Sequence, residues 1–301
     1  MLKRVSQSPS KLLDNNEILL IHFGGLGDVC LSESPFFSFQ KQFGDCLVGL
    51  GNKRFLDLFK EYFVRVEGVE SRKWLYLFSE KLDGRRWRRI IFIGKDREGI
   101  LRDRWQTYSE EKIIFIDIYP ENAFGMRTTN CGSPESGDTP KVHLQDYQLA
   151  QLTLSGVEPL EKISLWKRSP RVILYPEKGF EKEKWHHDNF IDLYHSLKAH
   201  DVDVILLESL GLSVNADKKV SFEDLTEVKR FFSEGGVFVS NDSGMAHFAG
   251  ASGLFTITIF TGFDPAIWHP RGRNISLVQG RDIPDLSFLE KLIKQTMNDF
   301  R

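Results

Sequence analysis

The sequence predicts an α/β fold of two similar domains, each built on a parallel sheet with helices on both faces. Short apolar runs alternate with helix-like segments along the whole chain, which is the pattern of parallel sheets covered by helices. Two of these runs, ILLIHF and KIIFIDI, are continuously apolar, as strands buried on both faces are. A chain of 301 residues is long for a single core and suits two domains of about 150 residues each.

In the first half, apolar runs predict four strands, at Glu17–Phe23, Asp45–Leu50, Arg89–Gly94 and Lys112–Ile118. Ser34 and Pro35 have the order of an N-cap and a first helical residue, so a helix is expected to start there. Residues 122–141 are rich in Gly, Pro, Ser and Thr and predict a long loop, followed by a helix at His143–Ser155. We place the domain boundary in the polar segment after it, which gives domains 1–165 and 166–301.

The second half repeats this plan. Strands are expected at Arg171–Tyr175, Asp203–Glu208, Val237–Ser240 and Phe255–Phe260, and helices at Asp188–His200 and Glu223–Ser233. Ser287 and Glu290 have the spacing of a capping box, which predicts a last helix over residues 286–301. That helix could pack back on the first domain.

Composition limits the classes of function. A net charge of −2 argues against a general nucleic-acid binder. The three cysteines, Cys30, Cys46 and Cys131, are an odd count without metal-ligand spacing, which fits a reducing compartment. The start, MLKRVSQSPSKLL, lacks the apolar core of a signal peptide, and no apolar run approaches the ~20 residues that span a bilayer. We expect a cytoplasmic protein with at most peripheral contact with a membrane.

The first candidate site is the loop Gly24-Gly25-Leu26-Gly27-Asp28, directly after the first strand. Ligands of α/β sheets bind beyond the carboxyl ends of strands, so the loop is placed for function. A dinucleotide fingerprint would need a third glycine where Cys30 stands. Asp28 is therefore interpreted as a carboxylate base that faces a cleft, and the alternative is a glycine-rich turn with a solvated aspartate.

The second candidate site is Asn241-Asp242-Ser243-Gly244, which follows a strand and opens a helix. The amide groups at a helix N-terminus suit a diphosphate, and Asp242 can accept hydrogen bonds from sugar hydroxyls. An ordinary Asp/Ser cap is the alternative. His247 lies one turn into the helix, as a phosphate contact or as a packed histidine. Thr261 and Gly262 follow another strand and could line a nucleotide site, although turn chemistry also explains them.

These motifs resemble the heptosyltransferases of glycosyltransferase family nine, enzymes of lipopolysaccharide core synthesis. The family's first motif is a strand, a Gly-x-x-Gly-Asp loop and a proline seven residues after the Asp, here Ile18–Phe23, Gly24–Asp28 and Pro35. Its second motif is a strand, Asn-Asp-Ser-Gly, two residues and His, here Asn241–His247. A later strand ends in Phe/Tyr-Gly-x-x-Asp-Pro, and Phe260–Pro265 carries one extra residue before the glycine. The resemblance covers nearly the whole chain.

The chain departs from the family at a third motif, a strand ending in His-Pro-Gly and then Lys-x-Trp-Pro. Tyr175-Pro176-Glu177 replaces the turn and puts a carboxylate where the family brings backbone near the donor phosphates. Glu183 stands where the family has the lysine two residues before Trp185. Lys182 and Lys184 flank that position, so a cation could still reach the phosphate. These changes leave open which nucleotide sugar is used.

The resemblance implies a GT-B fold, in which two Rossmann-like domains with parallel sheets face a central cleft. It implies an inverting, metal-independent transfer from an ADP-sugar, with ADP-heptose as the donor substrate and no cofactor, to a lipopolysaccharide-core or related glycan acceptor. Asp28 is then the base, with Gly25 and Gly27 on the acceptor side. The donor side would hold Asp242, Ser243, Gly244, His247, Lys182, Lys184, Glu208, Thr261 and Gly262.

The sequence contains two further clusters of charge. Asp201-Val202-Asp203 matches the Asp-x-Asp pattern of metal-dependent transferases, but it precedes a strand and is interpreted as a helix–strand turn, so no metal site is expected. The run from Arg85 to Arg89 is either a solvated turn or a site for the phosphates of an anionic lipid-linked acceptor, through Arg85, Arg86 and Arg88.

Two other classes of function stay open. A nucleotide-sugar-binding protein that has lost catalysis would keep Asp242-Ser243-Gly244 and tolerate the changes at Glu177 and Glu183. A dinucleotide-dependent oxidoreductase would also have two such domains, although neither half carries the full three-glycine fingerprint.

Overall fold

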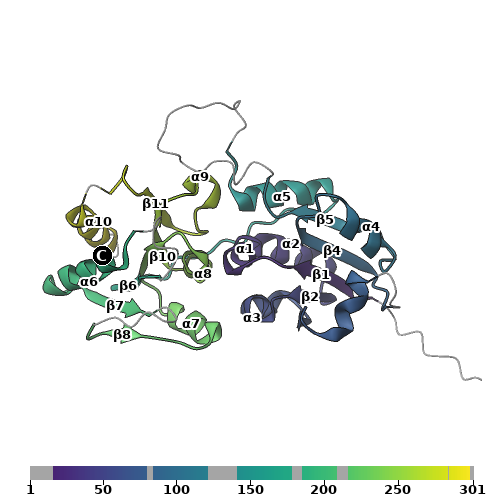
Figure 1. Ribbon diagram of the computed structural model, residues 1–301, viewed down its shortest axis with the longest axis horizontal. Helices are drawn as coiled ribbons and strands as arrows, with labels where there is room; N and C mark the ends of the chain where they lie inside the picture. Colours follow the sequence, from purple (N-terminus) through teal and green to yellow (C-terminus); the bar gives the residue numbers. More distant parts are fainter. Residues whose placement is uncertain are drawn as a thin grey trace, which may run out of the picture.

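The protein consists of two α/β units, each with its own parallel sheet (Figure 1). The computed structural model describes residues 16–79, 84–120, 141–177, 185–208, 216–283 and 285–298. Within these residues, no helix is long and apolar enough to cross a membrane. The segment after residue 154 carries no helix or strand before residue 171 and connects the two units. The predicted boundary at 165/166 falls inside it.

The first unit holds a five-stranded sheet with helices and 3₁₀ turns around it. Its elements are β1 (Ile18–His22), α1 (Leu26–Leu31), α2 (Glu33–Phe43), β2 (Leu47–Gly51), α3 (Lys53–Leu56), η1 (Asp57–Tyr62), β3 (Arg65–Gly68), η2 (Arg72–Phe78), β4 (Arg89–Gly94), α4 (Ile100–Gln106), β5 (Ile114–Asp117) and α5 (Leu144–Leu154).

The second unit holds a six-stranded sheet. Its elements are β6 (Arg171–Tyr175), α6 (His187–Ala199), β7 (Asp203–Leu207), β8 (Lys219–Val220), α7 (Leu225–Phe232), β9 (Val237–Asn241), α8 (Gly244–Ala251), β10 (Phe255–Phe260), α9 (Pro265–Trp268), β11 (Asn274–Val278) and α10 (Leu286–Asn298).

Strand order places both predicted motifs at positions suited to ligand binding. The first sheet has the order β3-β2-β1-β4-β5 and the second β11-β10-β9-β6-β7-β8, with all strands parallel. The order reverses beside β1 in the first sheet and between β6 and β9 in the second. Loops that leave the carboxyl ends of strands at such a switch point form the ligand crevice of open α/β sheets. The Gly24–Asp28 loop leaves β1, and Asn241–Gly244 begins at the end of β9.

Apolar side chains fill both faces of each sheet. On one face of the first sheet, Leu19 and Ile21 pack with Trp74 of η2 and Trp105 of α4. On the outer face of the second sheet, strand residues pack with α6 and with Leu289 and Ile293 of α10. The remaining faces share one buried cluster that runs from β1, α1 and α2 into β6, β9, α7 and α8. The two units are therefore joined by a continuous apolar core.

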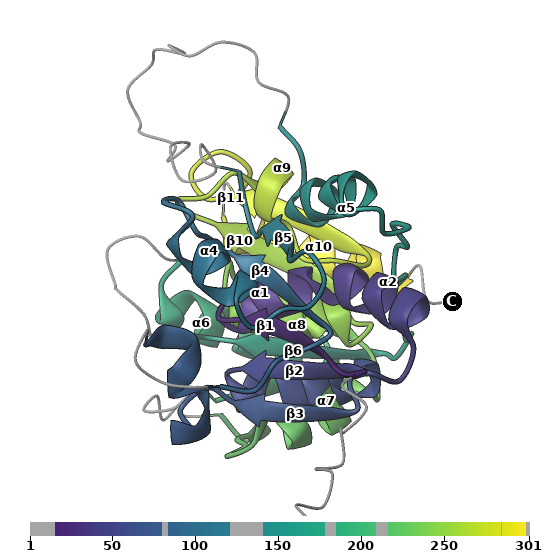
Figure 2. The same ribbon diagram turned by 90° about the vertical axis from the view of Figure 1, so that its right-hand side faces the viewer.

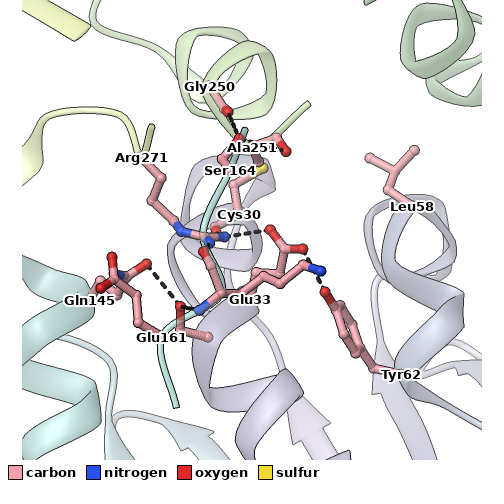
Figure 3. Close-up of polar contacts among 12 residues, drawn as sticks. Cys30, Glu33, Leu58, Tyr62, Gln145, Glu161, Ser164, Gly250, Ala251 and Arg271 are labelled. Carbon is pink, nitrogen blue, oxygen red and sulfur yellow. Dashed lines mark hydrogen bonds and ion pairs between the residues drawn. The ribbon is translucent and has the colours of Figure 1, made fainter. Parts of the chain in front are cut away.

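A buried polar network also joins the two units. Arg271, in the loop before β11, forms an ion pair with Glu33 of α2, and both side chains are at least nine-tenths buried (Figure 3). The Arg271 guanidinium also donates to the carbonyl oxygens of Cys30 and Lys162. Tyr62 donates its hydroxyl to the other oxygen of Glu33 at 2.7 Å. Burial, followed by the Glu33 charge, raises the pKa of Tyr62 well above its usual value.

Two helix starts and the packing of the last helix differ from what the sequence predicted. Helix α2 begins at Glu33 with Ser32 as its N-cap, so Ser34 and Pro35 lie inside its first turn. The last helix is capped by Asp285, which accepts from the Phe288 amide at 2.9 Å, and not by a Ser287–Glu290 box. Helix α10 packs on α6 and β9 of its own unit instead of returning to the first one, because its apolar face completes that core.

Candidate active site

A buried histidine holds the glycine loop after β1. His22 is the last residue of that strand and is fully buried. The Gly24 amide donates to His22 Nδ1 at 3.1 Å, so Nε2 carries the proton that Ser32 Oγ accepts at 3.1 Å. A side chain on Gly24 would meet the Asp28 Cβ at 2.5 Å, so the turn requires glycine there. The imidazole therefore fixes the loop's path out of the sheet.

Asp28 lies in the first turn of α1 and folds back on the start of that helix. Its Oδ2 accepts a hydrogen bond from the Gly25 amide at 2.8 Å. This is the bond of a capping box in which the third helical residue reaches back to the backbone of the N-cap residue. Burial raises the pKa of Asp28, and the Gly25 hydrogen bond opposes that shift. The side chain is half-buried. It thus combines the structural role of a cap with the raised pKa that suits a general base.

Asn241, the last residue of β9, anchors the loop that follows this strand. This side chain accepts from the Trp185 amide and donates to the Trp185 carbonyl, both at 3.1 Å. The contact ties the start of α6 to the start of α8. Ser243 caps α8 by accepting from the Ala246 amide at 3.4 Å. Asp242, next to it, keeps 15% of its side chain exposed, with Oδ1 lying 3.8 Å from His247 Nε2.

The two predicted loops meet directly, because α1 packs across the first turn of α8 (Figures 1 and 2). A Cβ on Gly27 would lie 3.0 Å from His247 Cδ2, and a Cβ on Gly244 would lie 3.2 Å from the Leu26 Cβ. These glycines therefore permit the close approach of the two units. Gly27 and Gly244 thus have a structural role at the contact between the two motifs.

Other predicted donor residues lie at the same edge of the second sheet. Thr261 and Gly262 follow the end of β10, and a Cβ on Gly262 would meet open space. Glu208 follows β7 and pairs with Lys219 at 2.9 Å. Glu208 lines a cavity of about 240 Å³ together with Tyr175, Glu177, Phe222, Met245 and, from the first unit, Arg54. This cavity lies beyond the carboxyl ends of β6 and β7.

Three imidazoles are neutral at pH 7, those of the buried His22 and His247 and that of the half-buried His143. Desolvation lowers the pKa of His22 to about 3 and that of His143 to about 4. Desolvation, followed by the charges of His143 and His269, lowers the pKa of His247 to about 3. The rings of His143 and His269 stack at 4.0 Å, and His143 Nε2 donates to the His269 carbonyl at 2.9 Å. His247 Nδ1 is buried with no hydrogen-bond partner among the described residues.

We expect stability to fall as the pH drops below about 6.5. In the unfolded chain these histidines bind a proton near pH 6.5, whereas in the folded protein His22, His143 and His247 do so only near pH 3 to 4. Acid therefore favours the unfolded state, and each histidine removes about 2 kcal/mol by pH 5. Urea unfolding at pH 7, 6 and 5 measures this loss.

The variant His22→Gln should unfold with a smaller dependence on pH, because one of the three groups is removed. His195 is exposed, so His195→Gln is the matched control and should keep the wild-type dependence. A free energy of unfolding that stays flat between pH 7 and 5 would contradict the neutral buried state.

Several predicted residues are not brought to this site. Lys182 and Lys184 lie outside the described residues. Arg85 pairs with Glu17, and Arg88 pairs with Glu111 at 2.8 Å. The run from Arg85 to Arg88 precedes β4, so these cations, with Arg86, gather at the amino edge of the first sheet, opposite the edge of Asp28. These arginines therefore lie away from the Asp28 loop, and their role in binding the acceptor stays a prediction.

The Asp-x-Asp pair also lies on the wrong edge for this site. Asp203 begins β7 and pairs with Lys218, and Asp201 lies in the turn before it. Within the part of the chain that the structure describes, a different group could hold a metal ion. His186, His187 and Asp188 have ligand atoms within 4.8 Å of one another at the start of α6.

Residues that the sequence analysis did not single out complete the site. His22 was included in an apolar strand, and its position at the strand's end beside a glycine loop was the available signal. Arg54, Met245 and Phe222 carry no local pattern that would indicate a cavity. Outside the site, Arg271 and Glu33 of the network that joins the two units are 238 positions apart, so nothing in the sequence pairs them.

Comparison with known proteins agrees with this architecture. The pattern of glycosyltransferase family 9 (heptosyltransferase) matches residues 133–292. The Escherichia coli heptosyltransferase WaaC, solved with ADP, superposes with a TM-score of 0.67 at 14% identity over 95% of this chain and 100% of that chain. A family 9 glycosyltransferase from Veillonella parvula superposes with a TM-score of 0.62 at 13% identity, over 96% of this chain and 98% of that chain. For E. coli ADP-heptose lps heptosyltransferase II the TM-score is 0.54 at 15% identity, over 93% of this chain and 99% of that chain. A comparison with curated protein sequences gives no match.

The structural matches confirm the fold, two parallel-sheet α/β units of the GT-B type. The family pattern covers more than half of the 301 residues, including Asp242-Ser243-Gly244 and Thr261-Gly262. The chain belongs to glycosyltransferase family 9, and it is a glycosyltransferase.

Proposed function

We propose that this chain transfers a heptose-like sugar from an ADP-sugar to a lipopolysaccharide-core or related glycan acceptor, with inversion and without a metal, in the cytoplasm. The observation that carries the proposal is the contact of the two motifs. The loop of Asp28 and the first turn of α8 approach each other at Gly27 and Gly244. A base on one unit then stands beside a diphosphate site on the other, as transfer between two bound substrates requires.

The cavity beside Glu208 supports binding of the donor's nucleoside. Tyr175, Phe222 and Met245 supply apolar wall, and the Glu208 carboxylate can accept hydrogen bonds from ribose hydroxyls. The diphosphate would then lie at the start of α8, where unpaired amides and the helix dipole favour anions. Two of the structurally similar E. coli WaaC structures were solved with ADP and with ADP-2-deoxy-2-fluoro heptose.

In the transfer step, the first unit would take up the acceptor proton and the second unit would stabilise the negative charge of the leaving diphosphate. Asp28 accepts the proton of the attacking acceptor hydroxyl, and its raised pKa makes it the stronger base for this step. The leaving diphosphate gains negative charge beside the amides that follow Ser243 and near His247. Lys182 and Lys184 are proposed to add positive charge there. Asp242 would hold hydroxyls of the donor sugar.

The experiment that tests the proposal measures turnover of nucleotide sugars. We expect ADP-heptose to raise the melting temperature more than UDP- or GDP-sugars, and to release ADP when a lipopolysaccharide-core acceptor is added. Turnover of a UDP- or GDP-sugar alone would reassign the donor. Binding without turnover on any acceptor would point to a decayed family member.

Replacing Asp242 with alanine should weaken donor binding by about 1.5–3 kcal/mol, the value of a hydrogen bond to a charged group. Calorimetry with the nucleotide sugar and with free ADP measures the two affinities. The affinity for the nucleotide sugar should fall, and the affinity for free ADP should stay unchanged. Asp203→Ala removes the same charge at the opposite sheet edge and should leave both affinities unchanged. Equal affinities for wild type and Asp242→Ala would remove Asp242 from the site.

Activity should survive EDTA. The charge of the departing diphosphate is assigned to helix amides and lysines, so no divalent ion is needed in this scheme. Initial rates before and after EDTA treatment and desalting should agree. Loss of activity that Mg²⁺ or Mn²⁺ restores would oppose the metal-free scheme. The variant His186→Ala/His187→Ala would then show whether the group at the start of α6 holds the ion.

A second candidate is a nucleotide-sugar-binding protein that no longer catalyses transfer. The observation in its favour is the acidic lining of the cavity, where Glu177, Glu223 and Asp224 add negative charge around Glu208. Such a lining disfavours a diphosphate that lies close to it. The turnover assay above separates this candidate from the enzyme.

A further inference from the structure

A second cavity shares no lining residue with the cavity beside Glu208 and is the larger of the two. Its volume is about 700 Å³, against about 240 Å³ for the cavity beside Glu208. The start of α5, the connecting segment 161–168 and the loop 269–273 form its walls. Trp166 in this wall packs on Phe255, the first residue of β10, with 5.3 Å between ring centroids. The cavity therefore opens at the amino edge of the second sheet, opposite the edge of Asp242.

Positive charge predominates in its lining. Lys162, Arg168, Arg271 and Arg273 face two carboxylates, Asp146 and Glu161. Arg271 is neutralised by the buried Glu33 (Figure 3). None of the ion pairs among the described residues includes Lys162, Arg168 or Arg273. Three cations of this lining therefore form no ion pair with a described residue, and they outnumber the two carboxylates, Asp146 and Glu161.

Two of these cations are held on a single side chain. The guanidinium carbon of Arg168 lies 5.2 Å from the centroid of the Trp166 ring, and that of Arg273 lies 5.3 Å from it. Both guanidinium groups therefore lie beside the same indole ring. An anion bound next to this ring would be attracted by two cations. Guanidinium groups bind phosphate oxygens with two parallel hydrogen bonds, so phosphate is the anion that fits.

Two apolar side chains of the cavity lining are exposed to solvent. Ile163 and Leu165 alternate along the connecting segment and are 68% and 77% exposed. Ser164 between them turns inward and donates to the Gly250 carbonyl at 2.6 Å (Figure 3). This bond fixes the segment so that its apolar side chains point to solvent. Exposed Lys167 continues the same side of the segment.

We propose that this cavity binds the phosphate of an anionic phospholipid and so holds the protein at a membrane surface. Arg168 and Arg273 take the phosphate, and Ile163 and Leu165 lie against the acyl chains. Apolar side chains beside cations are the combination by which proteins without a membrane span bind anionic bilayers. The site goes beyond sugar transfer and assigns membrane contact to the connecting segment instead of the run at Arg85.

Co-sedimentation with lipid vesicles tests the site. The wild-type protein should bind vesicles of phosphatidylcholine mixed with phosphatidylglycerol and not vesicles of phosphatidylcholine alone. The variant Arg168→Ala/Arg273→Ala should bind about 30-fold more weakly, because each cation near an anionic surface contributes about 1 kcal/mol. The variant Ile163→Ser/Leu165→Ser keeps the charge and should bind at least about tenfold more weakly. All four side chains lie at the surface, so the melting temperatures should stay unchanged.

The matched control removes two arginines elsewhere. Arg72 and Arg230 are exposed and do not line the cavity, so Arg72→Ala/Arg230→Ala should lose no more than about threefold. An equal loss in both double-arginine variants would mean a general charge effect and would overturn the site. Inorganic pyrophosphate is the soluble probe. If it raises the melting temperature through Arg168 and Arg273 while vesicles do not bind, the cavity is a site for a soluble phosphate and the lipid assignment is wrong.

Discussion

Replacing Arg271 with methionine is expected to lower the free energy of unfolding by about 3–5 kcal/mol, the usual result of leaving a buried charge unpaired. The side chain of Arg271 is 4% exposed and that of Glu33 is 8% exposed, so water cannot replace the lost partner. The carbonyls of Cys30 and Lys162 also lose a donor. Among the described side chains, Glu33 then keeps the Tyr62 hydroxyl as its hydrogen-bond donor. Urea unfolding of the wild type and Arg271→Met measures the change.

Two further variants separate charge from packing. Adding Glu33→Gln to Arg271→Met removes the stranded carboxylate while an amide oxygen still accepts from Tyr62, so part of the stability should return. Arg273→Ala, two positions away and exposed, is the matched control and should stay within about 0.5 kcal/mol of the wild type. A loss below about 1 kcal/mol for Arg271→Met would mean that the pair is solvated and does not join the two units.

Burial on both sides explains most of the strands that the sequence predicted. The exception is the run at Lys112–Ile118, which forms the edge strand β5 with alternating burial. The runs at Arg89–Gly94, Arg171–Tyr175 and Phe255–Phe260 coincide with β4, β6 and β10, which lie inside their sheets. The strands that the apolar runs did not predict are β3, β8 and β11, and each lies at an edge. Edge strands are short or polar because one side faces solvent, so RVEG and NISLV do not stand out as apolar runs.

The site could be predicted only as two separate motifs. Glycines after strands indicated where ligands bind, but the contact of Gly27 with the first turn of α8 depends on how the two units pack. The same limit applies to Arg271, whose partners come from α1, α2 and the connecting segment. Local charge patterns were also insufficient at Arg85 and Arg88, because Glu17 and Glu111 approach them only in the folded sheet.

Asp28→Asn is expected to lower kcat by at least about 100-fold, while donor affinity and melting temperature stay nearly unchanged. Asparagine keeps the size of the side chain, and its oxygen can still accept from the Gly25 amide, so the cap of α1 survives. What it loses is basicity. Burial raises the pKa of the Asp28 carboxyl, and a base of raised pKa takes a proton from an acceptor hydroxyl more readily. Single-turnover rates with saturating ADP-sugar and acceptor measure the change.

Asp96→Asn is the matched control, because Asp96 also follows a strand at this edge and caps a helix, accepting from Leu101 and Arg102. If a cap at this edge were enough to explain a loss, both variants would lose kcat alike. A selective loss in Asp28→Asn would instead assign the proton transfer to this carboxyl. Asp28→Ala removes both the helix cap and the base, so it should lose kcat and also have a lower melting temperature than Asp28→Asn. Full activity in Asp28→Asn would refute the base, and unfolding of Asp28→Asn would make Asp28 a structural turn residue.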